Sequence, residues 1–355
     1  MKRALVLAAL STMALSIVPE VAAAPSRLAF GYDGDRGAGV YVIDIDGTGL
    51  RRISGGTKMG LLNPSFESDW SPDGDEIAFV ARRNDADGTF TVNTDGTDLT
   101  RVSKAPCYSE YSPSWSPDAS QIALRHDTCE RMHVWVVGSD GRGKPDRNIS
   151  SGLGYLPEWR PNGGWITYTK RRQTTEGWRD DIYVVRPDGS RDRRVTLARG
   201  HRDTKRGSLG NDSAKWSPNG RWLAFVGGDE ATDSSSRGVC IVRFEGIGER
   251  CLTNGSRDES YPDWSPTGRR IVYESVKDGN SDIYTIRRNG KRERRLTHSD
   301  RDDMQPVWSP DGRWIAFLSK RDGNTELYVM HPDGSHKRRL TRSPGAETAP
   351  DWEPR

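Results

Sequence analysis

The sequence Trp308-Ser-Pro-Asp-Gly312 is one copy of a motif that recurs along the chain and decides its fold. Each copy begins with a tryptophan, and the seven copies start at Trp70, Trp115, Trp159, Trp216, Trp264, Trp308 and Trp352. The intervals between successive tryptophans are 45, 44, 57, 48, 44 and 44 residues. A period of about 40–50 residues is typical of the four-stranded blades of β-propellers, so the motif predicts one blade per repeat.

Each repeat contains the pattern of four short strands. In the last complete repeat one strand ends at Trp308, and alternating apolar or β-branched residues follow at 315–319, 326–330 and 338–341. The turn after the tryptophan suits its sequence, because Pro presets φ and Gly accepts a positive φ. Ala119 stands where the other complete turns have Gly, and we expect that turn to be strained by about 1 kcal/mol.

The two ends of the chain complement each other. Residues 27–54 contain three strand patterns and no tryptophan, whereas residues 347–355 contain one strand pattern, with Trp352, and no further strands. Joining the ends completes a split blade and closes the ring, which leaves six continuous blades between them. We therefore predict an all-β, seven-bladed propeller of four-stranded antiparallel blades, formed by residues 24–355 as a single domain.

Residues 1–23 have the pattern of a secretion signal. Lys2 and Arg3 precede an apolar run at 4–18, and Val21-Ala22-Ala23 fits a cleavage site. The run is too short to span a bilayer comfortably, which argues against a membrane anchor. We expect the mature protein to be periplasmic or secreted, without a transmembrane segment.

The four cysteines fit an oxidising compartment. Cys240 and Cys251 flank a hairpin-like stretch, which predicts a cross-strand disulfide, and Cys107 with Cys129 then forms the second pair. Metal ligation is the rival interpretation. It is disfavoured because the sequence has no Cys-x-x-Cys pair and the spacings are unlike those of a zinc site.

Composition excludes two classes of protein. The formal net charge is only +3, and a dedicated nucleic-acid binder needs a basic excess. The 12 Trp, 11 Tyr and 7 Phe supply large apolar surfaces and argue against disorder. Arginine-rich tracts at 287–295 and 337–339 fall on outer strands, where charge deters pairing with other chains. A surface for anionic partners is the alternative explanation of these tracts.

The repeats resemble those of TolB-type β-propellers. The shared features are the Trp-Ser-Pro-Asp-Gly units, the Asp-Gly-Asn loops at 278–280 and 322–324, and Arg-Arg-Leu-Thr endings such as 338–341. The resemblance covers nearly the whole chain after the signal and implies a propeller with protein partners in the cell envelope. The chain departs from TolB in showing no α/β domain before the repeats and in having seven predicted blades where six are expected.

Loop length varies on the face that carries the links between blades. The longest of these segments are 54–70, 170–181, 196–216 and 229–237. Variable loops on a rigid scaffold commonly carry binding, and neutral insertion explains them equally well. Trp178 and His201 lie in these segments and are candidate contact residues.

Polar residues also stand five positions before several of the tryptophans. They are Glu110, Asn211, Glu259, Asp303 and Glu347. Equivalent positions in a ring converge near the mouth of the central channel, so we name these as candidate binding residues. Carboxylates there can attract a basic segment of a partner or a divalent cation, and no other cofactor is expected. The alternative is that each carboxylate accepts local N–H bonds or pairs with an arginine.

The leading hypothesis is a monomeric, non-catalytic scaffold that binds a protein or peptide at its loop-rich face and channel mouth. The alternative is a metal-dependent carbohydrate-active enzyme, because oligogalacturonate lyases are similar propellers that hold manganese with histidines. The histidines here are His126, His133, His201, His298, His331 and His336. Only His201 and His298 fall in links between blades, so no three-histidine site is predicted.

Overall fold

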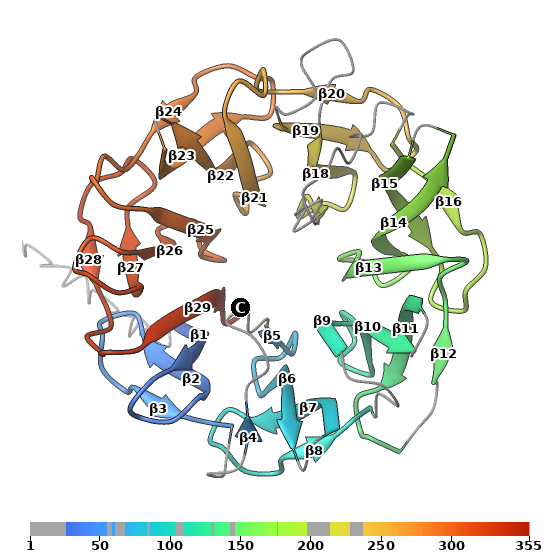
Figure 1. The fold of residues 1–355 in the computed structure, drawn as a ribbon, viewed down its shortest axis with the longest axis horizontal. Coiled ribbons are helices and arrows are strands. Elements are labelled where there is room, and N and C mark those ends of the chain that lie inside the picture. The colour runs from blue at the N-terminus through green and yellow to red at the C-terminus, as the bar shows by residue number, and fades with distance from the viewer. Residues whose placement is uncertain are drawn as a thin grey trace, which may run out of the picture.

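Seven antiparallel sheets surround a common axis (Figure 1). The computed structural model describes residues 26–54, 59–60, 68–83, 86–103, 110–128, 131–142, 146–175, 177–196, 214–227, 237–277 and 279–354. The fold is all-β, which confirms the predicted seven-bladed propeller. Within these ranges no helix is long and apolar enough to cross a membrane. The expected signal at 1–23 lies outside the described residues and stays a prediction.

The blades are numbered in chain order, and their strands are given from the innermost outward. Blade 1 consists of β29 (Ala346–Trp352), β1 (Arg27–Asp33), β2 (Gly39–Asp44) and β3 (Arg51–Arg52). Blade 2 consists of β4 (Met59–Gly60) and β5 (Ser68–Trp70), which both pair with β6 (Glu76–Arg83), followed by β7 (Ala86–Asn93) and β8 (Thr100–Arg101). Blade 3 consists of β9 (Glu110–Trp115), β10 (Gln121–Thr128), β11 (Arg131–Gly138) and β12 (Arg147–Asn148).

The other four blades follow the same order. Blade 4 consists of β13 (Leu153–Trp159), β14 (Ile166–Thr174), β15 (Gly177–Val185) and β16 (Arg193–Arg194). Blade 5 consists of β17 (Lys215–Trp216), β18 (Trp222–Gly227), β19 (Gly238–Arg243) and β20 (Arg250–Cys251). Blade 6 consists of β21 (Asp258–Trp264), β22 (Arg270–Lys277), β23 (Asn280–Arg287) and β24 (Arg294–Arg295). Blade 7 consists of β25 (Asp303–Trp308), β26 (Ile315–Ser319), β27 (Glu326–Met330) and β28 (Arg338–Arg339).

The ring is closed by the two ends of the chain, as the sequence predicted. The C-terminal strand β29 pairs antiparallel with β1, and Trp352 lies opposite Leu28. β29 is therefore the inner strand of a blade whose other three strands come from the N-terminal segment (Figure 1). The pairing completes a four-stranded blade from the two ends of the chain and so closes the ring.

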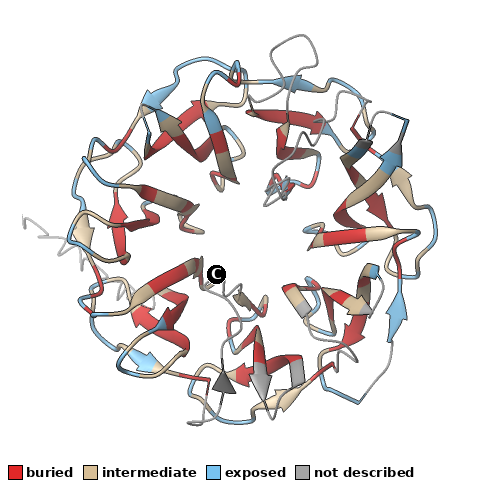
Figure 2. Cartoon of the chain, in the orientation of Figure 1, coloured by how far each residue is buried: buried red, intermediate tan, exposed pale blue. Residues whose placement is uncertain are grey.

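The core lies between neighbouring blades, and the repeated tryptophans are part of it. Their side chains are only 4% to 8% exposed. Trp70 of blade 2, for example, packs with Val40 and Ile53 of blade 1. The middle strands are the most buried parts of each blade, while exposed residues gather on the outer strands and turns (Figure 2). Sheet-on-sheet burial of apolar area around the ring is the main source of stability.

A hydroxyl at the end of each repeat fixes the third strand of its blade. The side-chain oxygen of a Ser or Thr accepts a main-chain N–H of that strand in all seven blades. The accepting residues are Ser54, Ser103, Ser150, Thr196, Thr253, Thr297 and Thr341. This bond explains why the Arg-Arg-Leu-Thr endings close with a hydroxyl residue.

The arginines of the same endings bind buried carboxylates. Arg295 pairs with Asp282, and Arg339 pairs with Glu326. Both acids are fully buried, so each pair satisfies a charge that burial would otherwise make costly. In these blades one arginine of each tract therefore has a structural role.

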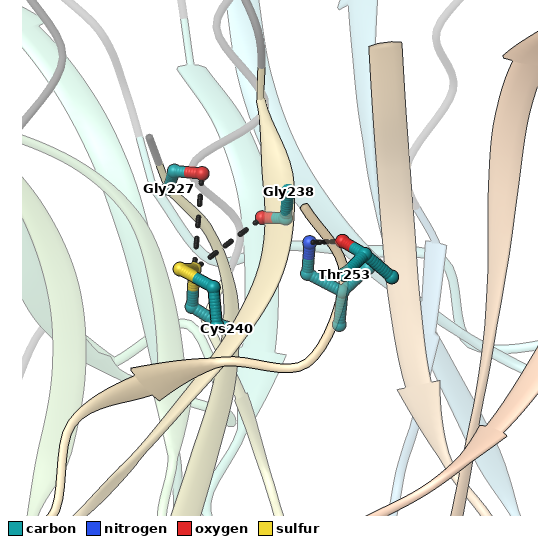
Figure 3. The surroundings of a disulfide bond; sticks show 6 residues. Gly227, Gly238, Cys240 and Thr253 are labelled. Carbon is teal, nitrogen blue, oxygen red and sulfur yellow. Dashed lines mark hydrogen bonds between the residues drawn. A yellow bond between two sulfur atoms is a disulfide. The ribbon is translucent and has the colours of Figure 1, made fainter. Parts of the chain in front are cut away.

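Blade 5 carries the predicted cross-strand disulfide. Cys240 of β19 and Cys251 of β20 are directly opposite each other and are bonded. Around the bond, the Cys240 Sγ lies 3.7 Å from the Gly227 carbonyl oxygen and 3.6 Å from that of Gly238 (Figure 3). The second predicted pair, Cys107–Cys129, lies outside the described residues and stays a prediction.

The turn at Ala119 has the strained conformation that the sequence predicted. Ala119 has a φ of 58°, in the region where the matching turns place glycines such as Gly74 and Gly312. A side chain with a Cβ is disfavoured there, which accounts for the cost expected at this turn.

Replacing Thr297 with Val tests the role of the terminal hydroxyl. Thr297 is fully buried, accepts the Ile283 N–H at 2.9 Å and donates to Asp282 Oδ1 at 3.0 Å. Thr297→Val leaves both partners buried without that bond, so we expect the free energy of unfolding to fall by about 1–3 kcal/mol in chemical denaturation. Thr297→Ser keeps the hydroxyl and should lose clearly less. Equal losses in the two variants would show that the hydrogen bonds do not matter.

Candidate functional site

The inner strands enclose a channel along the axis of the ring. The cavity in it has a volume of about 650 Å³ and is lined from every blade. Ten prolines line it, such as Pro113 and Pro117 of blade 3. Because proline has no N–H, the wall at these positions is largely apolar.

The charged side chains among the described lining residues form a single ring. Each blade contributes the residue immediately before its tryptophan, and we call these seven the channel ring: Asp69, Ser114, Glu158, Lys215, Asp263, Val307 and Asp351. Four are carboxylates and one is a cation. The channel ring is therefore acidic overall, although the chain as a whole has a formal net charge of +3.

The channel ring also joins the blades to one another. In five junctions the side chain of a ring residue accepts the main-chain N–H of the next blade's tryptophan, with distances from 2.6 Å for Asp69 with Trp115 to 3.2 Å for Asp351 with Trp70. In five junctions the tryptophan indole N–H donates to the main-chain carbonyl of the ring residue. Every junction has at least one of these bonds. We call this continuous set the inter-blade belt.

Burial in the channel wall raises the pKa values of three ring carboxyls. Burial raises the pKa of Asp69 to about 8; the nearby Asp351 carboxylate adds to the rise, and the Trp115 N–H opposes it. Burial likewise raises the pKa of Asp351 to about 7, against the attraction of Lys215. The pKa of Asp263 rises to about 6 through burial, and the Trp308 N–H opposes this shift.

Lys215 is the one cation of the channel ring. Its Nζ lies 3.0 Å from Glu158 Oε2, and its side chain is 50% exposed. The Glu158 carboxylate raises the pKa of Lys215, against the effect of burial, and Asp263 and Asp69 add to the rise. Lys215 therefore neutralises one side of the channel ring and leaves the opposite side, with Asp69 and Asp351, carboxyl-rich.

The carboxylates singled out from the sequence lie elsewhere. Glu259, Asp303 and Glu347 are buried, at 2%, 0% and 1% exposure, and are not among the residues that line the cavity. Asp303 pairs with Arg321 at 2.9 Å, and Glu347 accepts a hydrogen bond from Ser343. These contacts match the alternative of local pairing that the sequence left open, while a binding role for these residues stays a prediction.

A bulge in the inner strand explains the difference between the two positions. In blade 6, Ser260 pairs with Glu274 and Asp263 with Val272, so β21 has one residue more than β22 between these pairs. The extra residue reverses the alternation of side chains. The residue five positions before the tryptophan thus faces the preceding blade, and the one next to the tryptophan faces the channel.

The same bulge recurs around the ring. Five residues three positions before a tryptophan have φ between 44° and 53° despite carrying a side chain: Ser112, Leu156, Tyr261, Gln305 and Ala349. Each precedes a proline and lines the cavity. In these five blades the sequence therefore marks the ring position by a proline one residue before it, whereas Asp69 and Lys215 follow Ser68 and Ala214.

The other predicted contacts are only partly described. Glu110 begins β9 and its main chain pairs with His126, and nothing further is described for its side chain. Asn211 and His201 lie outside the described residues, as does most of 54–70, 196–216 and 229–237. Trp178 lies on β15 near the β14–β15 turn and is 42% exposed. The proposed role of the loop-rich face stays a prediction.

The described histidines are dispersed. His126 packs beside Trp135 in blade 3, whereas His331 and His336 stack in the β27–β28 turn of blade 7. Within the described part of the chain, no group of three or more His, Cys, Asp or Glu side chains is placed to hold a metal ion. The divalent cation expected at the channel mouth was not tested and stays a prediction.

Comparison with known proteins identifies the repeats. The family model of the TolB β-propeller domain matches residues 7–205, 70–275 and 213–355. A TolB homologue from Chlorobium luteolum is 34% identical over 157 residues, which are 43% of this chain and 31% of that protein. The chain spans between 28% and 49% of the length of the curated relatives that it matches.

Solved structures show the same fold at low sequence identity. TolB from Acinetobacter baumannii is 18% identical, with a TM-score of 0.57, over 92% of this chain and 82% of that one. An oligogalacturonate lyase in complex with manganese is 16% identical, with a TM-score of 0.64, over 86% of each chain. At these identities the likeness concerns the fold alone.

Replacing Asp69 with Asn tests how much the buried charge of this residue destabilises the fold. A carboxyl whose pKa is raised on folding favours the protonated form, so it costs stability as pH rises from about 4, its unfolded pKa, to about 8. Asn keeps an oxygen for the Trp115 N–H and has no charge. We expect Asp69→Asn to have the wild-type melting temperature near pH 4 and to exceed it by about 2 °C or more at pH 8.

Asp73→Asn is the matched control. Hydrogen bonding from Ser71 lowers the pKa of Asp73, so its charge contributes stability above pH 4. The control should therefore be equal to or less stable than the wild type at pH 8. A constant difference between Asp69→Asn and the wild type at all pH values would contradict the expected burial of this charge.

Proposed function

The chain belongs to the TolB β-propeller domain family, and from this premise we propose that it is a non-catalytic scaffold that binds a basic segment of a protein partner in its central channel. The observation that carries the proposal is the acidic channel ring inside a cavity of about 650 Å³. Cavities of about 300–1,000 Å³ commonly hold ligands. The cavity therefore has room for a short stretch of extended chain rather than a folded domain.

The distribution of polarity in the channel indicates what such a segment contains. The prolines and residues such as Val307 and Leu156 offer apolar contacts along the wall. Charge is confined to one level, the channel ring. An extended segment with a Lys or Arg side chain at that level, and apolar or small residues on either side, complements this wall.

The ring carboxylates retain capacity to accept such a cation. Asp69 uses Oδ2 for the Trp115 N–H, and Asp351 uses Oδ2 for the Trp70 N–H. A carboxylate has two oxygens, so each keeps a further acceptor. A bound ammonium or guanidinium between them also relieves the mutual repulsion that raises the pKa of Asp69.

Family membership supports a partner in the cell envelope. TolB homologues are among the relatives, and the disulfide of blade 5 fits an oxidising compartment. We accordingly propose a periplasmic or secreted location and an envelope protein as the partner. Similar folds in lyases and peptidases concern architecture only.

A fluorescent peptide with one central Arg flanked by Pro, Gly and Ala tests the proposal. Fluorescence anisotropy should show that Asp69→Asn/Asp263→Asn/Asp351→Asn binds this peptide at least tenfold more weakly than the wild type. The Asn side chains still accept the tryptophan N–H bonds, so the inter-blade belt is retained. A peptide with Glu in place of Arg should not bind.

The matched control is Asp73→Asn/Asp118→Asn/Asp311→Asn. These three aspartates lie in the Ser-Pro-Asp turns and are absent from the cavity wall, so the control removes equal charge outside the channel. It should bind as the wild type does. Equal weakening by both triple variants, or no binding of the Arg peptide by the wild type, would refute channel binding of a basic segment.

Binding should also depend on pH. The pKa values of about 8 for Asp69 and about 7 for Asp351 mean that these carboxyls are partly protonated near neutrality. A cationic side chain favours their ionised forms, so the peptide should bind more tightly as pH rises from 6 to 8.5. Anisotropy titrations across this range measure the trend. The Asp69→Asn/Asp351→Asn variant should lose most of it.

A further inference from the structure

A second charged region lies outside the channel ring, on neighbouring turns of blades 5 and 6. Four turns lead into β18, β20, β22 and β24. These turns and the strand ends next to them contain nine basic residues: Arg221, Arg243, Arg250, Arg269, Arg270, Arg287, Arg288, Lys291 and Arg292. They contain only three acids, Glu245, Glu249 and Glu293. Blades 5 and 6 are neighbours on the ring, with β20 and β24 at its outer edge (Figure 1).

At the centre of this region three arginines surround one indole. The guanidinium carbons of Arg243, Arg250 and Arg288 lie 5.1, 5.6 and 5.3 Å from the ring centroid of Trp222. Trp222 itself packs on the core between blades 5 and 6. Each of the three guanidinium groups therefore lies against the same anchored indole, and we call this set the arginine cluster.

Main-chain bonds hold the supporting turns in place. The Arg250 Nη2 donates to the Arg288 carbonyl oxygen at 3.0 Å, which links the two blades. The Arg288 N–H donates to the carbonyl of Arg269 at 3.0 Å, and the Arg243 N–H donates to that of Ile247 at 3.1 Å. The cluster is thus built on anchored backbone rather than on a free loop.

No carboxylate of the described residues forms an ion pair with any of the three arginines. This distinguishes them from several other arginines stacked on aromatic rings. Arg321 lies over Tyr328 and pairs with Asp303, while Arg27 lies over Trp70 and pairs with Glu353. In those two places a carboxylate neutralises the stacked guanidinium.

Two of the three acids of this region, Glu245 and Glu293, have other described partners. Burial lowers the pKa of Arg160 and of Arg193, and the Glu245 carboxylate opposes that shift. Glu245 therefore interacts electrostatically with arginines of blade 4. Glu293 accepts a hydrogen bond from Tyr273 and lies 4.0 Å from Arg257. Three like charges around one ring repel one another, and a bound anion would remove that repulsion.

We propose that the arginine cluster binds a phosphate-type oxyanion. A guanidinium group is planar and offers paired N–H donors that match two oxygens of one phosphate, and three such groups match a tetrahedral anion from several sides. The ligand is either a soluble phosphate compound or the headgroup of an anionic phospholipid. Both present the same phosphate chemistry to the cluster. Ile247 in the adjacent turn is 57% exposed, so replacing it in a vesicle-binding experiment distinguishes a lipid headgroup from a soluble phosphate compound.

Calorimetric titration with sodium pyrophosphate at low ionic strength tests the site. The wild type should bind one pyrophosphate, and Arg243→Gln/Arg250→Gln/Arg288→Gln should bind it at least tenfold more weakly. The control Arg51→Gln/Arg142→Gln/Arg313→Gln removes the same charge from exposed positions in blades 1, 3 and 7, and should bind as the wild type does. Absence of binding by the wild type, or equal weakening by both triple variants, would overturn the proposal.

A lysine variant keeps the test decisive if the glutamine variant folds poorly. Arg243→Lys/Arg250→Lys/Arg288→Lys preserves the charge but removes the paired N–H donors and the Arg250 bond geometry. We expect it to melt cooperatively and to bind pyrophosphate several-fold more weakly than the wild type. Undiminished binding by this variant would show that diffuse positive charge, and not a guanidinium site, attracts the anion.

Co-sedimentation with vesicles distinguishes the two sources of phosphate. Vesicles containing phosphatidylglycerol are compared with vesicles of phosphatidylcholine alone. Retention on the first, lost in the glutamine variant and weakened by Ile247→Ser, would assign the site to a lipid headgroup. Pyrophosphate binding without vesicle retention would assign it to a soluble phosphate compound.

Discussion

The inter-blade belt is the interaction on which the rest of the structure depends. Each tryptophan is buried against the preceding blade and at the same time donates its main-chain or indole N–H to the residue next to the preceding tryptophan. The junction across the chain ends is no exception, since Trp70 binds Asp351 and Trp352 binds Val307. A ring built in this way needs a hydrogen-bond acceptor for the tryptophan N–H at the inner edge of every blade. Either a main-chain carbonyl or a polar side chain can be that acceptor.

This requirement also shapes the channel. Carboxylates at the ring positions satisfy the tryptophan N–H groups, but they bring charge into a wall otherwise made of prolines and apolar side chains. Their raised pKa values express the cost of that burial. Where a side chain is not needed as an acceptor, as at Val307, the belt continues through the main chain alone. Carboxylates in the channel ring therefore go beyond what closure of the ring demands, which is why we connect them with binding.

Charge is separated within the molecule despite its small net value. Acidic groups converge on the axis, whereas three arginines that form no ion pair with a described carboxylate surround Trp222 on the turns of blades 5 and 6. Other arginines, such as Arg295 of blade 6 and Arg339 of blade 7, are neutralised by buried carboxylates. Net charge thus says little about the partners of this protein, because groups of opposite charge are gathered at different places in the structure.

The sequence by itself determined the architecture. The tryptophan period, the turn residues and the complementary ends predicted seven blades, closure by the last strand and the Cys240–Cys251 bond, because each of these follows from local patterns repeated at fixed spacing. Only the tertiary structure decided which polar residues face the channel. Alternation alone places Glu259 and Asp263 on one side of their strand, but the bulge at Tyr261 turns them to opposite sides. A single left-handed residue before a proline, stabilised by the packing of the whole ring, is invisible to pattern counting and sets the chemistry of the channel.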